Sequence, residues 1–237
     1  PLGASNKMIL IVFFLIGIIL PPIYLYLRKL ILNKAESREE VERHISAPVL
    51  GEMCTDHSGR SLVVTEHDTS SATELFRLLR SNLQFLLGGS GDKIVLMTST
   101  KSGEGKSFIA INLAASLALQ HGKKVLLVGM DIRNPQIGNY LGINPKWGLT
   151  NYLSAGNLAL SDIISHVEGT SSLDVIVAGP IPPNPAELLM SDAVDKLFEQ
   201  LRPMYDYIIV DTAPVGMVSD TFTLDRIADA SIYVTRI

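Results

Sequence analysis

The feature that most constrains the fold is an alternation, after residue 73, of short apolar runs with segments of helical periodicity. Strands without a polar face are typical of parallel sheets that are covered on both sides. The sequence therefore predicts an α/β fold, with a mostly parallel sheet and helices on both faces. The expected strands are Ile94–Met97, Val125–Val128, Val175–Ala178, Ile208–Val210 and Ser231–Thr235. The expected helices are Thr73–Leu87, Ser107–Gln120, Leu160–Val167, Ala186–Leu201 with a break near Ser191, and Thr221–Ala228.

A glycine-rich segment, TSTKSGEGKS at residues 98–107, joins the first of these strands to the next helix. It follows the P-loop pattern GxxxxGK[ST], except that Thr100 stands at the first glycine. Backbone N–H groups of such a loop converge on phosphate oxygens, and the following helix adds its dipole. The sequence thus predicts a P-loop NTPase fold that binds a nucleoside triphosphate and Mg²⁺. The expected nucleotide contacts are Lys101, Ser102, Gly103, Glu104, Gly105, Lys106, Ser107 and Phe108.

Two acidic residues follow other expected strands. Asp211 ends the run Tyr207–Val210, as a Walker B carboxylate does, and Asp131 comes shortly after Val125–Val128. The carboxyl ends of parallel strands meet at one edge of a sheet, where ligands of α/β proteins bind. We therefore expect Lys106, Asp131 and Asp211 as catalytic residues, and Ser107, Asp131 and Asp211 as Mg²⁺ ligands. The alternative for each aspartate is a structural role in capping the turn that follows it.

A third feature is the uncharged apolar run Met8–Leu27, which is long enough to cross a hydrocarbon core of about 30 Å as a helix. A cleaved signal peptide and a buried core helix are the alternatives. A signal peptide would export the phosphate-binding body to a compartment without ATP, so we favour a transmembrane helix. Pro21 and Pro22 are expected to kink the helix, or to mark the end of a shorter span.

Positive charge flanks this run mainly on its C-terminal side. Only Lys7 precedes it, whereas five basic residues follow: Arg28, Lys29, Lys34, Arg38 and Arg43. The positive-inside rule therefore predicts that the body faces the cytoplasm. We expect residues 1–32 to form the transmembrane helix and its flanks, 33–72 a juxtamembrane linker with a short strand at Leu62–Thr65, and 73–237 the P-loop domain.

Composition excludes several classes of protein. Hydrophobic residues make up 47% of the 237, which is enough for a core and excludes global disorder. Cys54 is the single cysteine, which excludes a disulfide framework. Residues 1–45 hold six basic and four acidic residues, which is a net charge of +2. Because the net charge of the whole chain is −4, residues 46–237 carry a net charge of −6. A net-acidic body argues against nucleic acid as a partner.

Four segments together resemble the bacterial tyrosine kinases over about residues 46–237. They read TSTKSGEGKSFIAINLAASLA at 98–118, MDIRNP at 130–135, YDYIIVDTAP at 205–214 and ELFRLLRSNL at 74–83. The resemblance implies the cytoplasmic kinase module of a polysaccharide co-polymerase, preceded by its second transmembrane helix, in the bacterial inner membrane. It further implies ATP and Mg²⁺ as cofactors and a C-terminal tyrosine cluster that is phosphorylated in trans within a ring of subunits. Polysaccharide export machinery and a phosphatase are the other implied partners.

The resemblance also implies that Glu74, Arg77 and Arg80 form the EX2RX2R motif that pairs neighbouring subunits. These residues share one face of a helix, and by spacing alone they would be a solvated face with an intrahelical ion pair. Lys101 is similar in place to the signature lysine of MinD/ParA ATPases, and a solvated loop lysine is its alternative.

The chain departs from the family pattern in two places. The family has Asp-x-Asp-x-Arg after the second strand, whereas this sequence has Gly129 at the first position, so we assign the role of general base to Asp131. No tyrosine cluster is present, and we expect a chain that begins at Pro1 and ends at Ile237 to be a piece of a longer protein. The predicted function is an autophosphorylating protein-tyrosine kinase in capsule or exopolysaccharide chain-length control. A MinD/ParA-like ATPase switch and an ATP-binding scaffold without kinase activity are the alternatives.

Overall fold

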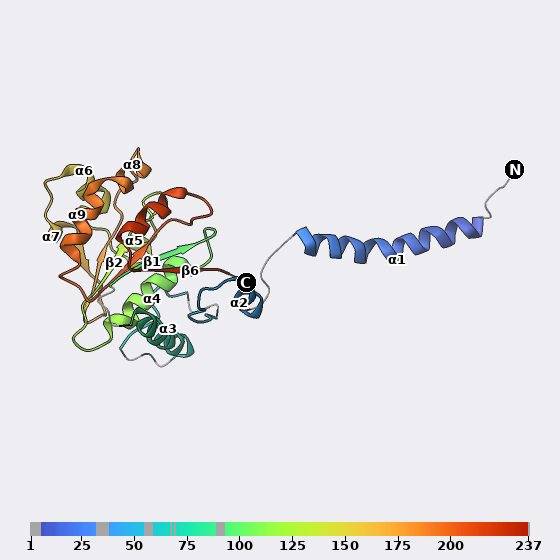
Figure 1. Cartoon of the computed structure of the whole chain (residues 1–237), viewed down its shortest axis with the longest axis horizontal. Coiled ribbons are helices and arrows are strands. Elements are labelled where there is room, and N and C mark those ends of the chain that lie inside the picture. The colour runs from blue at the N-terminus through green and yellow to red at the C-terminus, as the bar shows by residue number, and fades with distance from the viewer. Residues whose placement is uncertain are drawn as a thin grey trace. The chain divides into compact units, whose positions relative to one another are not determined.

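The computed structural model (Figure 1) describes residues 6–31, 38–54, 59–66, 68, 70–88 and 93–236. Lys34, one of the basic flanking residues, lies outside this part. The chain divides into two compact units, residues 1–49 with residue 237, and residues 50–236. The first unit contains helices α1 (Asn6–Ile31) and α2 (Arg38–His44).

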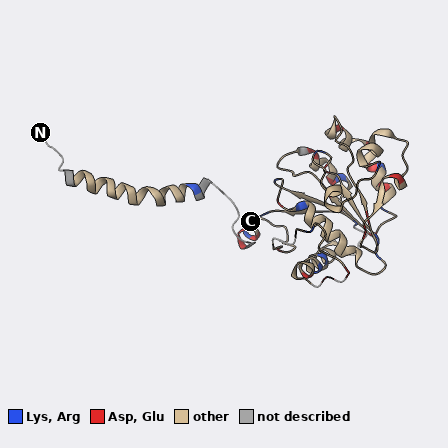
Figure 2. Cartoon of the chain, turned by 180° about the vertical axis from the view of Figure 1, so that it is seen from behind, with Lys and Arg blue, Asp and Glu red and all other residues tan. Residues whose placement is uncertain are grey.

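Helix α1 is long and apolar enough to cross a membrane. Residues Met8–Arg28 have a mean hydropathy of 2.7, and none of this stretch is buried. The helix continues through Pro21 and Pro22 as one curved ribbon, so these prolines do not end it (Figure 1). Among the helix residues whose side chains the structure describes, the basic one is Arg28, near the C-terminal end (Figure 2).

The second unit is built on a six-stranded sheet with the order β3-β4-β2-β5-β1-β6. Every pairing is parallel except that of β3 with β4. The register places Leu96 of β1 beside Val210 of β5, and Gly129 of β2 beside Asp211 of β5. The predicted parallel sheet is confirmed. Its strands are β1 (Ile94–Ser99), β2 (Val125–Gly129), β3 (Ile164–His166), β4 (Leu173–Ile176), β5 (Tyr207–Asp211) and β6 (Ala230–Val234).

Helices cover both faces of the sheet, as the apolar strands predicted. On one face of the sheet, α3 and α4 pack against strand side chains such as Leu127. On the other face, helices α6, α7, α8, α9 and η1 pack against strand side chains such as Val128. Alternate residues of a strand thus enter opposite cores, because side chains alternate across a sheet. The helices are α3 (Ser71–Leu87), α4 (Lys106–Ala118), α5 (Ile137–Leu141), α6 (Leu149–Ala155), α7 (Leu160–Ile163), α8 (Pro185–Met190), α9 (Asp192–Leu201) and the 3₁₀ helix η1 (Ser219–Ile227).

The predicted helix Leu160–Val167 is wrong in its second half. Helix α7 ends at Ile163, and β3 then pairs antiparallel with β4, with Ser165 opposite Val175. A strand edge was available on β4, and the β-branched residues at 163, 164 and 167 fit a strand better than a helix. The segment predicted as a helix at Thr221–Ala228 forms η1, and the predicted break near Ser191 separates α8 from α9.

The short strand predicted at Leu62–Thr65 does not form, and a side chain takes the place of a neighbouring strand. The backbone N–H groups of Val63 and Val64 donate to Oδ1 of Asn112 on α4, at 2.8 and 3.1 Å. Both valines are buried against α3 and α4. The described residues between 50 and 72, which were expected within the linker, belong to the second unit of the chain.

A carboxylate holds the start of β1 and supplies a first testable prediction. Asp229 accepts hydrogen bonds from the backbone N–H groups of Lys93 and Ile94, at 2.7 and 2.8 Å, and forms a two-bond ion pair with Arg202. Partial burial by itself raises the pKa of Asp229, but the hydrogen bonds from Arg202, Ile94 and Lys93 and the charge of Arg202 together outweigh it and lower the pKa. We expect Asp229→Ala to lower the free energy of unfolding by about 1–2 kcal/mol.

The pH dependence of this effect has a definite sign. Because the folded-state pKa of Asp229 lies below its ordinary value of 3.8, its stabilisation is complete above that pH and is lost as the pH falls through the folded-state pKa. Thermal unfolding of the full chain in detergent, as a function of pH, measures this. The exposed Asp225→Ala variant is the control. An equal loss of stability in both variants would show that the bonds of Asp229 contribute nothing.

Candidate nucleotide-binding site

The loop between β1 and α4 has the backbone conformation that a P-loop requires. Gly103 and Gly105 adopt φ angles of 87° and 88°, in the left-handed region that side-chain-bearing residues avoid. The backbone N–H of Lys101 donates to Oε2 of Glu104 at 2.9 Å, which closes the loop. Helix α4 begins directly after Gly105, so its first N–H groups face the same loop.

A glycine elsewhere in the chain approaches the backbone of Thr100, the residue that replaces the first glycine of the pattern. A Cβ atom added to Gly216 would lie 2.3 Å from the carbonyl oxygen of Thr100, so the segment after β5 can approach the loop only with glycine there. The Thr100 hydroxyl bonds to the hydroxyl of Tyr233 on β6. Sequence reasoning missed Gly216, because no local pattern links it to the P-loop.

The predicted residues Lys106, Ser107 and Asp211 are in direct contact. The Lys106 ammonium forms an ion pair with Oδ1 of Asp211, and the Ser107 hydroxyl donates to Oδ2 at 2.7 Å. Lys106 is 6% exposed and Asp211 is 1% exposed. Burial raises the pKa of Asp211, while the Lys106 ammonium and the two hydrogen bonds oppose that shift.

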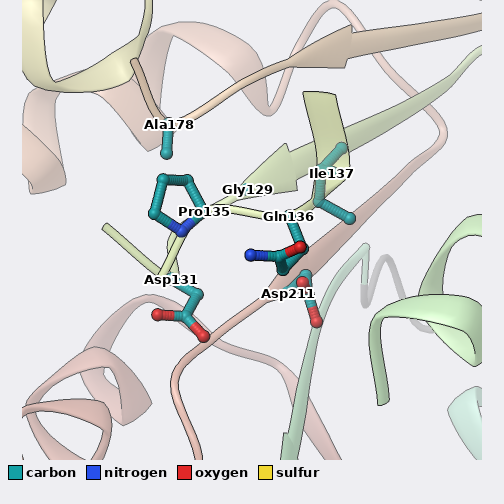
Figure 3. A pocket seen from close by; sticks show the side chains of 7 residues that line it. All are labelled: Gly129, Asp131, Pro135, Gln136, Ile137, Ala178 and Asp211. Atoms are coloured by element: carbon teal, nitrogen blue, oxygen red, sulfur yellow. The ribbon is translucent and has the colours of Figure 1, made fainter. Parts of the chain in front are cut away.

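Asp131 lies in the same pocket as Asp211 (Figure 3). The backbone N–H groups of Met130 and Asp131 donate to the carbonyl oxygen of Asp211, at 2.8 and 3.0 Å, which ties the two strand ends together. Asp131 also accepts a hydrogen bond from the backbone N–H of Asn134 at 3.0 Å, so it caps the turn as well. The oxygens of Ser107, Asp131 and Asp211 form a hard, oxygen-only donor set, which fits Mg²⁺.

Two predicted nucleotide contacts can contribute less than the rest of the loop. The ring of Phe108 packs against Phe76, with centroids 6.0 Å apart, which leaves its backbone N–H as the group that can bind phosphate. The Lys101 side chain is exposed, and the hydrogen bonds of this residue within the described chain are made by its backbone.

The three residues of the expected oligomerisation motif have different surroundings. Glu74 and Arg77 form an ion pair on the outer face of α3. Arg80 instead points toward α4, where it donates to the carbonyl oxygen of Ser116 at 2.6 Å. Its Nε atom is buried without a hydrogen-bond partner among the described residues, and burial lowers its pKa. Arg80 therefore links α3 to the P-loop helix, whereas Glu74 and Arg77 face outward.

Two further residues lie near the site: Arg133, which stands at the arginine of the Asp-x-Asp-x-Arg pattern, and Gln136, which no sequence pattern singled out. The guanidinium of Arg133 pairs with Asp220 and so joins the loop after β2 to η1. Gln136, just before α5, lines the same pocket as Asp131 and Asp211. At Gly129 an added Cβ would lie 3.4 Å from Cγ1 of Ile137, which is an ordinary van der Waals contact.

Comparison with known proteins agrees with this geometry. Residues 92–232 match the AAA domain family. The tyrosine-protein kinase CpsD of Streptococcus agalactiae is 42% identical over 164 residues, which cover 69% of this chain and 68% of CpsD. The putative tyrosine-protein kinase EpsB of Ralstonia solanacearum is 32% identical over 93% of this chain, and the chain spans about a third of its length, 31%.

A solved structure agrees as well. The kinase domain of the Escherichia coli tyrosine kinase ETK superposes with a TM-score of 0.78 at 31% identity, covering 86% of this chain and 82% of that domain. The P-loop, the two acidic strand ends and these relatives lead to one conclusion. The chain belongs to the bacterial tyrosine kinases.

Proposed function

We propose that this protein is a membrane-anchored, ATP-dependent protein-tyrosine autokinase. The observation that carries the proposal is the buried contact of Lys106 and Ser107 with Asp211, with Asp131 in the same pocket. Phosphoryl transfer requires positioning and charge stabilisation more than covalent chemistry from the protein, and these residues supply both. The names of CpsD, EpsB and ETK as tyrosine kinases support the choice of tyrosine as acceptor.

Each residue has a distinct part in the proposed mechanism. Lys106 and the backbone N–H groups of residues 102–108 would hold the β- and γ-phosphates of ATP, and the phosphates would compete with Asp211 for the Lys106 ammonium. Bound Mg²⁺ would neutralise charge on these phosphates, held by Ser107, Asp131 and Asp211. Asp131 would accept the proton as the tyrosine oxygen attacks the γ-phosphorus and ADP leaves.

The membrane anchor and its orientation are part of the proposal. Helix α1 is apolar and unburied over Met8–Arg28, and most of the flanking basic residues follow it. By the positive-inside rule, we infer that the kinase body lies on the cytoplasmic side of a bacterial inner membrane. The family resemblance supports a role in capsule or exopolysaccharide chain-length control, with export machinery and a phosphatase as partners.

Helix α3 supports the proposed self-association in a ring. Leu78 and Phe85 are 55% and 85% exposed, and they share the outer face of α3 with Glu74 and Ser81. Large apolar side chains that share an exposed face beside charged residues are typical of an interaction surface. The partner we propose for this face is a second copy of the chain.

Phe85→Ser is therefore expected to lower the mass of the oligomer. The substitution removes an exposed aromatic ring from the proposed contact and leaves the core of the subunit intact. Light scattering of the full chain in detergent micelles measures the mass. Phe222→Ser, which removes a ring of 67% exposure on η1, is the matched control. Identical masses for wild type and both variants would argue against α3 as the contact.

The scaffold alternative rests on Gly129, because the family pattern has an aspartate at this position and the pocket therefore lacks one carboxylate. A kinase and a scaffold differ in product, because only a kinase forms phosphotyrosine. The test is detection of phosphotyrosine after incubation of the full chain with Mg-ATP, compared with Lys106→Met. Signal in wild type above that of the variant supports the kinase, and equal signals would favour the scaffold or an ATPase switch.

A further inference from the structure

The pocket at the ends of β2 and β5 contains a side chain to which no role has yet been given. Its lining includes the carboxylates of Asp131 and Asp211 together with the amide of Gln136. Figure 3 shows this amide pointing into the space that the two carboxylates border. Gln136 is half-buried, so it is both held by the protein and reachable by a ligand.

The loop that carries Gln136 is fixed at both ends. Its first residues donate two backbone hydrogen bonds to the carbonyl oxygen of Asp211. Ile132 and Ile137 are 1% and 2% exposed, and they anchor the loop on either side of the turn. A residue at this position is thereby held at a constant place relative to Asp131 and Asp211.

The side chain of Gln136 is itself oriented by a neighbour. Its Nε2 atom donates to Oδ1 of Asn134 at 2.9 Å, and Asn134 in turn donates its backbone N–H to Asp131. An amide nitrogen carries two N–H groups, and Asn134 uses one of them. In the described part of the chain no residue accepts a hydrogen bond from the second.

The chemistry of the pocket favours a neutral donor at this place. Asp131 and Asp211 already supply two carboxylates, and the phosphoryl group to be transferred is itself an anion. A third carboxylate would repel it, whereas an amide N–H adds no charge and stabilises a developing negative charge by donation. Gly129 contributes no side chain to the pocket, and Gln136 carries the uncharged polar side chain among the lining residues.

We propose that the second N–H of the Gln136 amide holds the phenolic oxygen of the acceptor tyrosine while Asp131 takes its proton. The new bond joins the phenolic oxygen to the γ-phosphorus, and the bond from that phosphorus to the β–γ bridging oxygen breaks as ADP leaves. The amide N–H stabilises the phenolate character that develops as the proton moves to Asp131. This inference rests on the proposed kinase function.

The test measures kinetics of the full chain with Mg-ATP and a synthetic glutamate–tyrosine copolymer as acceptor. Gln136→Ala is expected to lower kcat about 10-fold, with the KM for ATP changed less than about 2-fold. Gln136→Glu is expected to lower kcat further, because it adds a charge next to two carboxylates. Asn134→Ala is expected to have a smaller effect, since it releases the amide without removing it. Gln200→Ala, on the exposed face of α9, is the control.

Three results would overturn the inference, and they are distinguishable. A wild-type kcat in Gln136→Ala would exclude a contact with the acceptor. A fall in ATP affinity equal to the fall in kcat/KM would move Gln136 to nucleotide binding. Absence of phosphotyrosine in wild type, at the level of Lys106→Met, would instead contradict the proposed kinase function, and the acceptor role would fall with it.

Discussion

Replacing Lys106 with methionine is expected to lower ATP affinity at least about 100-fold and to eliminate phosphotyrosine formation. Lys106 is the buried ammonium at the start of α4, in the position that neutralises the β- and γ-phosphates of a nucleotide. Methionine has a similar length but no charge and no donor. Equilibrium binding of a fluorescent ATP analogue and immunodetection of phosphotyrosine measure the two effects.

The same substitution is expected to destabilise the nucleotide-free protein. It leaves the Asp211 carboxylate, which is 1% exposed, without its ammonium partner. Breaking a buried pair on one side costs about 3 kcal/mol, which corresponds to a fall in Tm of about 10 °C for a body of this size. The double variant Lys106→Met/Asp211→Asn removes both charges. We therefore expect its Tm to recover most of the loss seen in Lys106→Met, while kinase activity stays absent.

This pair of variants separates folding from function. If Lys106→Met kept the wild-type Tm, the ion pair would not be a stabilising contact in the free protein. If the double variant bound ATP as wild type does, neither residue would belong to the nucleotide site. Neither variant changes Ser107, so differences between them do not come from loss of its hydroxyl.

Asp131→Asn is expected to lower phosphotyrosine formation about 100-fold or more while ATP affinity stays within a few-fold of wild type. Asparagine keeps the oxygen that caps the backbone N–H of Asn134, so the turn is preserved. It cannot take a proton from a tyrosine hydroxyl. Because Gly129 removes the other carboxylate of the family pattern, this chain has no second aspartate on the same loop to replace Asp131.

A time course of phosphorylation, with nucleotide binding measured on the same samples, checks this prediction. The exposed Asp225→Asn variant on η1 controls for the loss of one negative charge. Retained phosphorylation in Asp131→Asn, together with normal ATP binding, would remove Asp131 as the base and leave Asp211 as the remaining carboxylate of the pocket.

The approach of Lys106, Ser107, Asp131 and Asp211 to one another could be predicted from the sequence because its signals are local. Lys106 and Ser107 begin a helix, Asp211 ends a strand and Asp131 follows one, and the parallel sheet gathers those ends at one edge. The burial of Lys106 and Asp211, and the contact of Ser107 with Asp211, follow from that geometry.

Contacts between distant segments could not be predicted in the same way. Spacing places Arg80 on one face with Glu74 and Arg77, but only the packing of α3 on α4 shows that it reaches the Ser116 carbonyl. Gly216 is required by the carbonyl of Thr100, more than a hundred residues earlier. The pairing of β3 with β4 likewise depends on a free strand edge, which periodicity does not reveal.

The most direct test of the account is phosphotyrosine formation by the full chain with Mg-ATP and the glutamate–tyrosine copolymer, compared with Lys106→Met/Asp211→Asn. The double variant is expected to keep the fold, so it controls for folding as well as for contaminating kinases. We expect phosphotyrosine to accumulate with time in wild type and to be absent in the double variant. Equal accumulation, or none in either protein, would contradict a tyrosine kinase that acts through Lys106 and Asp211.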